Sequence, residues 1–163
     1  MARVPFASSE VDIVATPARV WDVLVNVQQW PDWLPTVTSI ERLDSGPLAT
    51  GSRTRIVQPR LRPAVWRVTE LDASKGNFVW IARSPGVTIT GGHYITPTPL
   101  GCHALLTIAF SGLFAPLARR MYGNLTRDYV HTEAESLKLR SETWRKHGTS
   151  DLGTEATRQR ASR

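Results

Sequence analysis

The chain has 163 residues, of which 41% are hydrophobic and 21% are charged. This length predicts one domain, and the composition is that of a globular protein and not of a disordered one. Twenty lysines and arginines against fourteen acidic residues give a net charge of +6. The basic residues are dispersed and are not interleaved with aromatic side chains, so the sequence argues against nucleic acid as a partner.

Cys102 is the single cysteine, which excludes an intramolecular disulfide and fits a reducing compartment. No apolar run approaches the roughly 18 residues of a membrane span, and the first residues lack the apolar core of a signal peptide. We therefore expect a cytoplasmic protein. The spacing of the four histidines matches no zinc motif, and no glycine-rich phosphate loop is present, so the sequence predicts no metal and no cofactor.

The first elements follow from alternation and from capping signals. Val11 and Ile13 alternate with acidic residues, which predicts a half-buried strand. Thr16 and Pro17 are typical of an N-cap and a first helical position, and apolar residues then recur at helical spacing over residues 20–27. A tryptophan-rich turn bracketed by two prolines predicts a second short helix.

The middle of the chain consists of short strand candidates separated by turn residues. They are Val37 to Leu43, Ser52 to Gln58, Val65 to Leu71, Asn77 to Arg83, Val87 to Ile95 and Cys102 to Ser111. Short strands with turn signals between them predict one antiparallel meander. A curved sheet of this kind needs an element on its concave side, and the only long element left is a helical pattern at residues 114–147.

That helical pattern changes sides along its length. The apolar residues of its first half lie nearly opposite those of its second half when counted at about 100° per residue. A bend or a change of packing partner between Gly123 and Asp128 would explain this change. Residues 148–163 contain almost no apolar side chains, which predicts a disordered basic tail after a domain of residues 1–147.

Several sequence segments, taken in order, resemble the START-like (SRPBCC) superfamily and most closely its polyketide cyclase/dehydrase-like branch. The segments are Thr16 to Leu24, Trp30 to Pro35, Trp66 to Asp72, Asn77 to Trp80 and Val130 to Glu142. The resemblance implies an α+β helix-grip fold, in which about seven antiparallel strands wrap around a long C-terminal helix and two short helices follow the first strand. It also implies a deep cavity between sheet and helix, because members of the superfamily carry or modify lipids, sterols, hormones and polyketides.

Strand parity decides which side chains can face such a cavity. Ile89 and His93 share the apolar side of their strand, so we expect His93 to point inward. A histidine there is either a satisfied core residue or a polar anchor and general acid or base for a ligand carbonyl, the weak catalytic candidate of this chain. A positioned acid or base of this kind contributes about 10²–10⁴ in rate.

The other candidate ligand-binding residues are mostly aromatic or apolar. They are Trp33, Arg55, Trp66, Trp80, Ile89, Phe110, Leu117, Met121 and Leu125. The orientation of Trp66 and Trp80 stays open, and Arg55 either faces solvent or, if it points inward, pairs with a carboxylate or enolate. Trp33 is either a hydrophobic plug for its turn or part of the rim of the entrance.

These features predict a protein, monomeric or homodimeric, that binds a small hydrophobic molecule (a lipid, a quinone or a polyketide-like compound) without catalysis. The alternative is a polyketide aromatase/cyclase, in which a polar cavity residue transfers protons at an aldol step. Thr69 and Leu71 stand where the resemblance would place the arginine of such cyclases. A third hypothesis is a quinone or lipid chaperone that acts at a membrane protein, with transient membrane or lipid contact favoured by the basic surface.

Overall fold

Seven strands form one antiparallel sheet in the computed structural model, which describes residues 4–143. The elements in chain order are β1 (Ala7–Ile13), α1 (Pro17–Val25), the 3₁₀ turn η1 (Val27–Gln29), α2 (Trp30–Trp33), β2 (Ser39–Arg42), β3 (Arg53–Val57), β4 (Ala64–Asp72), β5 (Asn77–Ser84), β6 (Val87–Thr98), β7 (Gly101–Ser111) and α3 (Ala115–Thr143). Each predicted strand and helix is present, and the predicted α+β helix-grip architecture is confirmed. Residues 144–147 of the predicted helix and the predicted tail lie outside the described residues.

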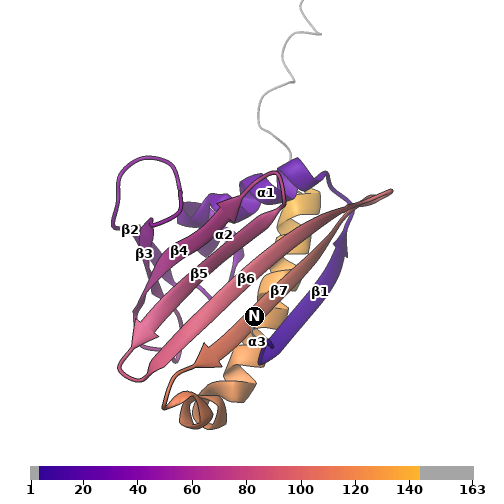
Figure 1. Ribbon diagram of the computed structural model, residues 1–163. Helices are drawn as coiled ribbons and strands as arrows, with labels where there is room; N and C mark the ends of the chain where they lie inside the picture. The colour runs from indigo at the N-terminus through magenta and orange to yellow at the C-terminus, as the bar shows by residue number, and fades with distance from the viewer. Residues whose placement is uncertain (1–3, 144–163) are drawn as a thin grey trace, which may run out of the picture.

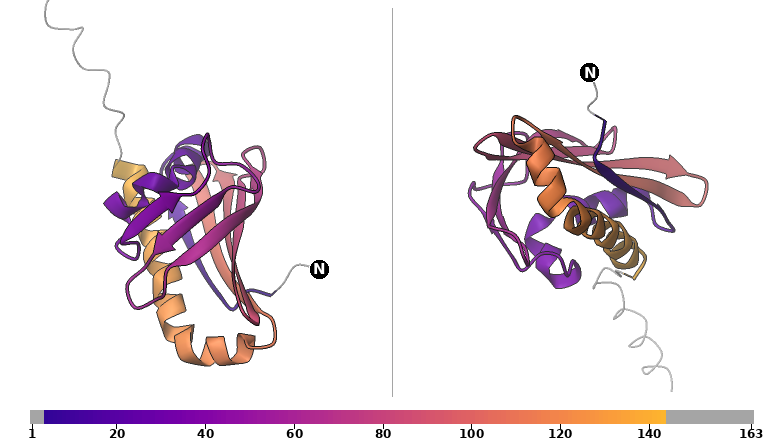
Figure 2. Two further views of the ribbon diagram at one scale, coloured as in Figure 1. Left: turned by 90° about the vertical axis from the view of Figure 1, so that its left-hand side faces the viewer. Right: turned by 90° about the horizontal axis from the view of Figure 1, so that it is seen from below.

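The strands follow the order β1-β7-β6-β5-β4-β3-β2, so the meander from β2 to β7 is completed by β1 at its far edge. In the β1–β7 pair, Ala7 is the partner of Ile108 and Ile13 the partner of Cys102. The sheet curves, with α3 and the short helices on its concave side (Figures 1 and 2). Cys102 faces the core, and its burial raises the pKa of the thiol above the ordinary value.

The short helices close one end of the concave side. The Thr16 hydroxyl accepts a hydrogen bond from the Arg19 amide at 3.3 Å, and Pro17 takes the first turn, as the capping signals predict. Val20 and Leu24 on the inner face of α1 are fully buried. The indole Nε1 of Trp30 donates to the Leu24 carbonyl at 3.0 Å, which fixes α2 against the end of α1.

The helix α3 bends in its first half, as its change of apolar side predicts (Figure 2). Its second half buries Val130, Ala134 and Leu137 on strands β1 and β7. Gly123 is buried in the first half, and a Cβ there would lie 3.0 Å from Cζ of Phe6. The glycine therefore allows the N-terminal segment to approach the helix closely.

Hydrogen bonds to the backbone hold the C-terminal end of α3 to the end of β1. Oε1 of Glu142 accepts from the Val14 amide at 2.8 Å and from Nζ of Lys138 at 2.8 Å. Lys138 also donates to the Asp12 carbonyl. The hydrogen bond from Lys138 holds the pKa of Glu142 below its ordinary value, with a smaller contribution from Val14. These contacts fix where the helix lies over the sheet.

Gly91 makes room for Trp80 on the inner face of the sheet. A Cβ at Gly91 would lie 2.8 Å from Nε1 and 3.0 Å from Cδ1 of the Trp80 ring, and the two residues are Cα partners of β5 and β6. Since interiors are close-packed, an added methyl group must displace the ring.

We expect Gly91→Ala to lower the free energy of unfolding by about 1–3 kcal/mol, because it overpacks the interior. The measurement is urea denaturation followed by tryptophan fluorescence. Thr90→Ala, on the other side of the same strand, is the control and should cost less. Equal stability of Gly91→Ala and the unmodified protein would show that the ring is free to move.

Candidate functional site

Aromatic side chains cover the inner face of β4 and β5. Trp66 and Trp80, whose orientation the sequence left open, both point inward and are 8% and 4% exposed. Their ring centroids lie 5.3 Å apart, and Phe78 packs edge-on against Trp80 at 4.9 Å. Trp30 of α2 contacts Trp80 from above the sheet at 5.2 Å. Four rings therefore fill the space between α2 and this half of the sheet.

His93 lies at the edge of this cluster and is 4% exposed, with the inward orientation expected from strand parity. Its ring stacks on Phe78 at 4.9 Å. Nδ1 lies 3.2 Å from the Phe78 carbonyl oxygen, and Nε2 lies 2.8 Å from Oε1 of Glu133 on α3. The histidine thus joins β5, β6 and α3 at one point.

The two contacts of His93 constrain its protons. A backbone carbonyl and an ionised carboxylate can only accept hydrogen bonds. An Nε2–H of the ring can therefore donate to the Glu133 carboxylate, and an Nδ1–H can donate to the Phe78 carbonyl. A proton on Nε2 lies between the ring and the carboxyl group. Because the Glu133 side chain is 20% exposed, this proton is held at the boundary of the interior.

Two polar atoms on neighbouring strands are buried without a hydrogen-bond partner: Oγ1 of Thr54 and Nε1 of Trp66. Thr54 and Trp66 are Cα partners of β3 and β4 and share the inner face. Side chains in such cross-strand pairs have Cβ atoms about 4.5–5.5 Å apart. Each buried polar group without a partner costs about 1–3 kcal/mol, so this point of the inner face favours a further polar atom.

Glu133 and Thr54 were missed by the sequence reasoning. Glu133 follows Val130 and precedes Ala134 and Leu137, so a carboxylate at the margin of the buried helical stripe was the available signal. Thr54 alternates with the two arginines of its strand, and it lies on the side of the buried Ile56. That alternation placed a hydroxyl on an apolar face.

The remaining apolar candidates lie in or beside the core. Ile89 packs against the core and is the Cα partner of Phe110, which is 5% exposed and contacts the ring of Phe6 edge-on at 5.4 Å. Trp33 is half-buried, with its ring 5.9 Å from that of Trp30, and it lines a small recess of about 80 Å³. Leu125 is half-buried on α3.

Three of the candidate ligand-binding residues lie away from the concave interior. For Arg55 this is the solvent-facing orientation that the sequence left open, and for Leu117 and Met121 it corrects the expected position. Arg55 points to solvent and lies 3.8 Å from Glu41, because Thr54 and Ile56 occupy the inner side of β3. Leu117 and Met121 are 55% and 63% exposed, because the bend carries the first half of α3 away from the sheet.

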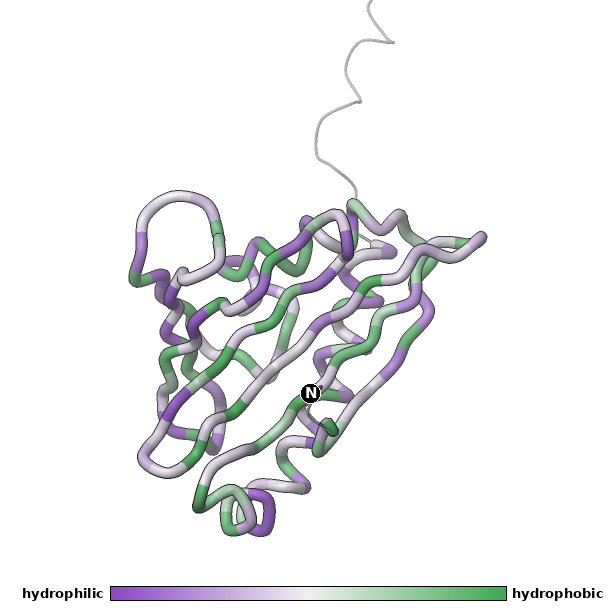
Figure 3. The backbone as a smooth tube through the Cα atoms, viewed as in Figure 1, coloured by the Kyte–Doolittle hydropathy of each residue, from purple (hydrophilic) through white to green (hydrophobic). Residues whose placement is uncertain are grey.

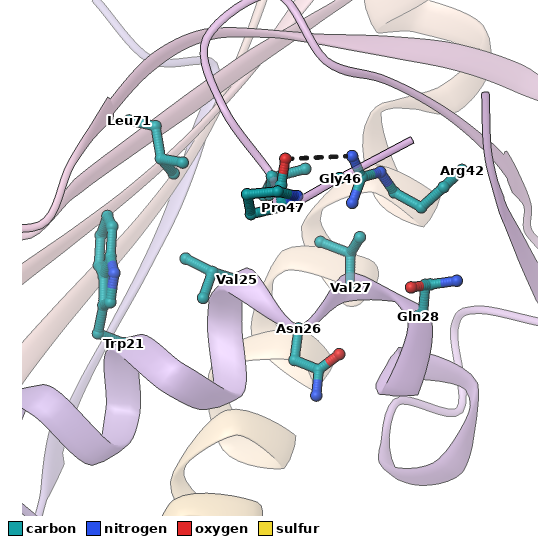
Figure 4. Close-up of a pocket in the computed structure, with 10 residues that line it drawn as sticks. Trp21, Val25, Asn26, Val27, Gln28, Arg42, Gly46, Pro47 and Leu71 are labelled. Atoms are coloured by element: carbon teal, nitrogen blue, oxygen red, sulfur yellow. Dashed lines mark hydrogen bonds between the residues drawn. The ribbon is translucent and has the colours of Figure 1, made fainter. Parts of the chain in front are cut away.

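A cavity of about 360 Å³ lies beside α1 and not under α3. Trp21 and Leu71 form one end of it, and Arg42 and Gln28 form the other, as Figure 4 shows. Nη2 of Arg42 donates to the Pro47 carbonyl at 3.5 Å. No residue of α3 is among those that line this cavity, so its position differs from that expected between the sheet and the terminal helix.

The β2–β3 loop, which contributes to this cavity, carries a solvent-exposed ion pair with Arg53 of β3. Nη2 of Arg53 lies 2.9 Å from Oδ1 of Asp44, and the Arg53 amide donates to the other oxygen of that carboxylate. The side-chain hydrogen bond from Arg53 is the main reason why the pKa of Asp44 lies below its ordinary value, and Arg42 contributes weakly. Asp44 is thus paired with Arg53. Among the residues that line the cavity, Arg42 has the only charged side chain.

A family comparison decides which group of proteins this chain falls into. The model of the family "Polyketide cyclase / dehydrase and lipid transport" matches residues 7–142. The chain belongs to this family. No curated protein matches the chain in sequence. Within residues 4–143, no cluster of three or more histidine, cysteine or acidic side chains could hold a metal ion, and no helix is long and apolar enough to cross a membrane.

Solved structures with the same fold come from bacteria and plants. The protein TTHA0849 of Thermus thermophilus is 20% identical with a TM-score of 0.67, over 83% of this chain and 95% of that one. The Zhui aromatase/cyclase of a Streptomyces species is 19% identical with a TM-score of 0.69, over 83% and 92%. A norcoclaurine synthase of Thalictrum flavum is 14% identical with a TM-score of 0.64, over 82% and 91%. At these identities the likeness establishes the fold of this family member and leaves its ligand open.

Thr54→Val should raise the free energy of unfolding of the ligand-free protein by about 1 kcal/mol, because it replaces an unpartnered buried hydroxyl by a methyl group of similar size. Thermal and urea denaturation measure the change. Thr90→Val, on the outer face of β6, is the control and should not give this gain. A loss of stability in Thr54→Val would mean that the hydroxyl has a bonding partner.

Proposed function

We propose that this protein binds a small hydrophobic molecule against the inner face of β3 to β6 and beside the second half of α3, and that the packed aromatic side chains there shift to admit it. The observation that carries the proposal is the pair of buried, unpartnered polar groups, Oγ1 of Thr54 and Nε1 of Trp66, next to an aromatic surface. An oxygen atom of a ligand would accept from the indole and exchange a hydrogen bond with the hydroxyl. The ligand would thereby offset a cost that the ligand-free interior carries.

The surrounding side chains favour a particular ligand chemistry. Trp66, Trp80 and Phe78 offer ring faces and edges, which suit a planar, unsaturated molecule. Burial of the apolar part of such a ligand contributes about 25 cal/mol per Å². A quinone or a polyketide-like compound, with carbonyl oxygens on a flat carbon skeleton, matches these groups better than a plain fatty acyl chain.

A second candidate function is catalysis of an aldol or dehydration step, and the His93–Glu133 contact of 2.8 Å favours it. With the shared proton on the imidazole, the Glu133 carboxylate would accept a proton from a carbon next to a ligand carbonyl, and His93 would give one to the carbonyl oxygen. The proton balance of an aldol step then closes within the pair. Relatives of this fold include an aromatase/cyclase, which supports this candidate only by analogy.

The binding proposal predicts that the neutral probe N-phenyl-1-naphthylamine gains fluorescence with the protein and is displaced by menadione, a naphthoquinone. Thr54→Val should weaken menadione binding about fivefold, the loss of one hydrogen bond of ordinary strength. Trp21→Ala, which opens the cavity beside α1, should leave the affinity unchanged. If Trp21→Ala abolishes binding and Thr54→Val does not, the cavity beside α1 is the site. If no probe binds, the proposal is wrong.

The catalytic candidate predicts that Glu133→Gln lowers turnover of a poly-β-ketone thioester by about 10²-fold or more, while menadione binding persists. The amide keeps the shape of the side chain but cannot accept the carbon-bound proton. Product analysis by chromatography, compared with spontaneous cyclisation, measures the effect. A protein that binds menadione and yields only the spontaneous products is a binding protein and not a cyclase.

A further inference from the structure

Three segments distant in sequence meet at one end of the molecule. The β3–β4 loop, the β5–β6 turn and the start of α3 follow β3, β5 and β7. These three strands run in the same direction in the antiparallel sheet, so the segments that follow them lie at the same end. The Phe114 amide donates to the Gly86 carbonyl at 2.9 Å, and the Tyr129 hydroxyl donates to the Pro59 carbonyl. In Figure 1 the β5–β6 turn and the first turns of α3 occupy the lower end of the view.

This end exposes a continuous run of large apolar side chains. The residues are Leu113 at 81%, Phe114 at 51%, Leu117 at 55%, Met121 at 63% and Tyr122 at 40% exposure. They include Leu117 and Met121, two of the candidate ligand-binding residues. Figure 3 shows these first turns of α3 as hydrophobic residues beside hydrophilic ones. Single exposed apolar residues are ordinary, but a contiguous group of this kind marks an interaction surface.

The charged residues in the three segments that form this end are all basic. The segments 58–63, 83–87 and 112–127 contain no aspartate or glutamate, and they contain six arginines: Arg60, Arg62, Arg83, Arg119, Arg120 and Arg127. Arg119 donates to the Phe110 carbonyl at 2.8 Å, and Arg127 stacks over the Phe6 ring at 4.7 Å, so these two are held against the body of the protein. All six are exposed. The opposite end carries Asp12, Asp72 and Glu142.

We propose that this apolar–basic end, formed by segments 58–63, 83–87 and 112–127, docks on the surface of an anionic lipid bilayer. Leu113, Leu117 and Met121 would enter the boundary between headgroups and acyl chains, and the exposed arginines would contact lipid phosphates. The combination of exposed apolar residues with unopposed basic residues is what such a surface requires. Leu113, Leu117 and Met121 are the most exposed apolar residues of this end, and they offer no ring on which a nucleic-acid base could stack, so the surface favours lipid over nucleic acid.

The proposal does not depend on the small-molecule site. It concerns a surface at which the bend of α3 turns apolar residues outward, and no residue of the Thr54–Trp66 pair or of the His93–Glu133 pair belongs to it. Failure of one proposal therefore leaves the other standing. Together the two proposals describe a protein that binds at the lipid bilayer in which its hydrophobic ligand is dissolved.

The test is co-sedimentation of the full chain with phosphatidylcholine vesicles, with and without phosphatidylserine. We expect binding to the vesicles that contain phosphatidylserine, weakening as salt is added. Leu117→Ser/Met121→Ser should lower the vesicle partition constant about tenfold or more, since two exposed apolar side chains lose their burial in lipid. Leu100→Ser is the matched control, because Leu100 is 83% exposed at the opposite end, and it should bind normally.

The double variant Arg60→Gln/Arg62→Gln tests the charge contribution. Its control is Arg55→Gln/Arg67→Gln, which removes the same amount of charge from the outer face of the sheet. Only the first pair should weaken binding to phosphatidylserine, again about tenfold. Equal loss in both pairs would show that net charge alone drives binding and would overturn the proposal. Unchanged vesicle binding by Leu117→Ser/Met121→Ser would also overturn it. So would binding to a single-stranded RNA that is tighter than binding to the vesicles and is not weakened by Leu117→Ser/Met121→Ser.

Discussion

The packing of the second half of α3 on β1 and β7 determines how the rest of the interior is filled. Glu142 and Lys138 fix the helix over that edge of the sheet through their contacts with Val14 and Asp12. The inner face of β3 to β5 is then covered by tryptophan and phenylalanine rings and by α2. Two polar atoms on this inner face, Oγ1 of Thr54 and Nε1 of Trp66, have no hydrogen-bond partner.

Much of the architecture was predictable, because alternation, turn residues and capping act locally. The Thr16 cap, the strand boundaries and the inward side of His93 all depend on residues that are close in sequence. The partner of His93 was not predictable in this way, since Glu133 reaches it only once α3 lies across the sheet. The position of the cavity beside α1 likewise depends on how the β2–β3 loop folds back, which no periodicity encodes.

Membership of the polyketide cyclase/dehydrase and lipid transport family agrees with an interior that combines rings with a few polar groups. The fold itself serves many activities, so the side chains of this chain must decide between them. Its inner face offers one shared proton, one free indole N–H and one free hydroxyl. Its outer surface offers apolar side chains and arginines at the end where α3 bends. These two regions use different residues, and the two proposals made for this chain are therefore independent of each other.

The pairing of the first strand with the last one affects how the chain reaches its native state. Ala7 lies beside Ile108, so β1 has no neighbour on a nascent chain until β7 has left the ribosome. Contacts between such distant residues slow folding, because a long loop must close before they form. An unpaired strand is also a template for aggregation while it waits. During synthesis there is therefore an interval in which β1 is unpaired, and binding of a chaperone to the N-terminal segment would prevent aggregation in that interval.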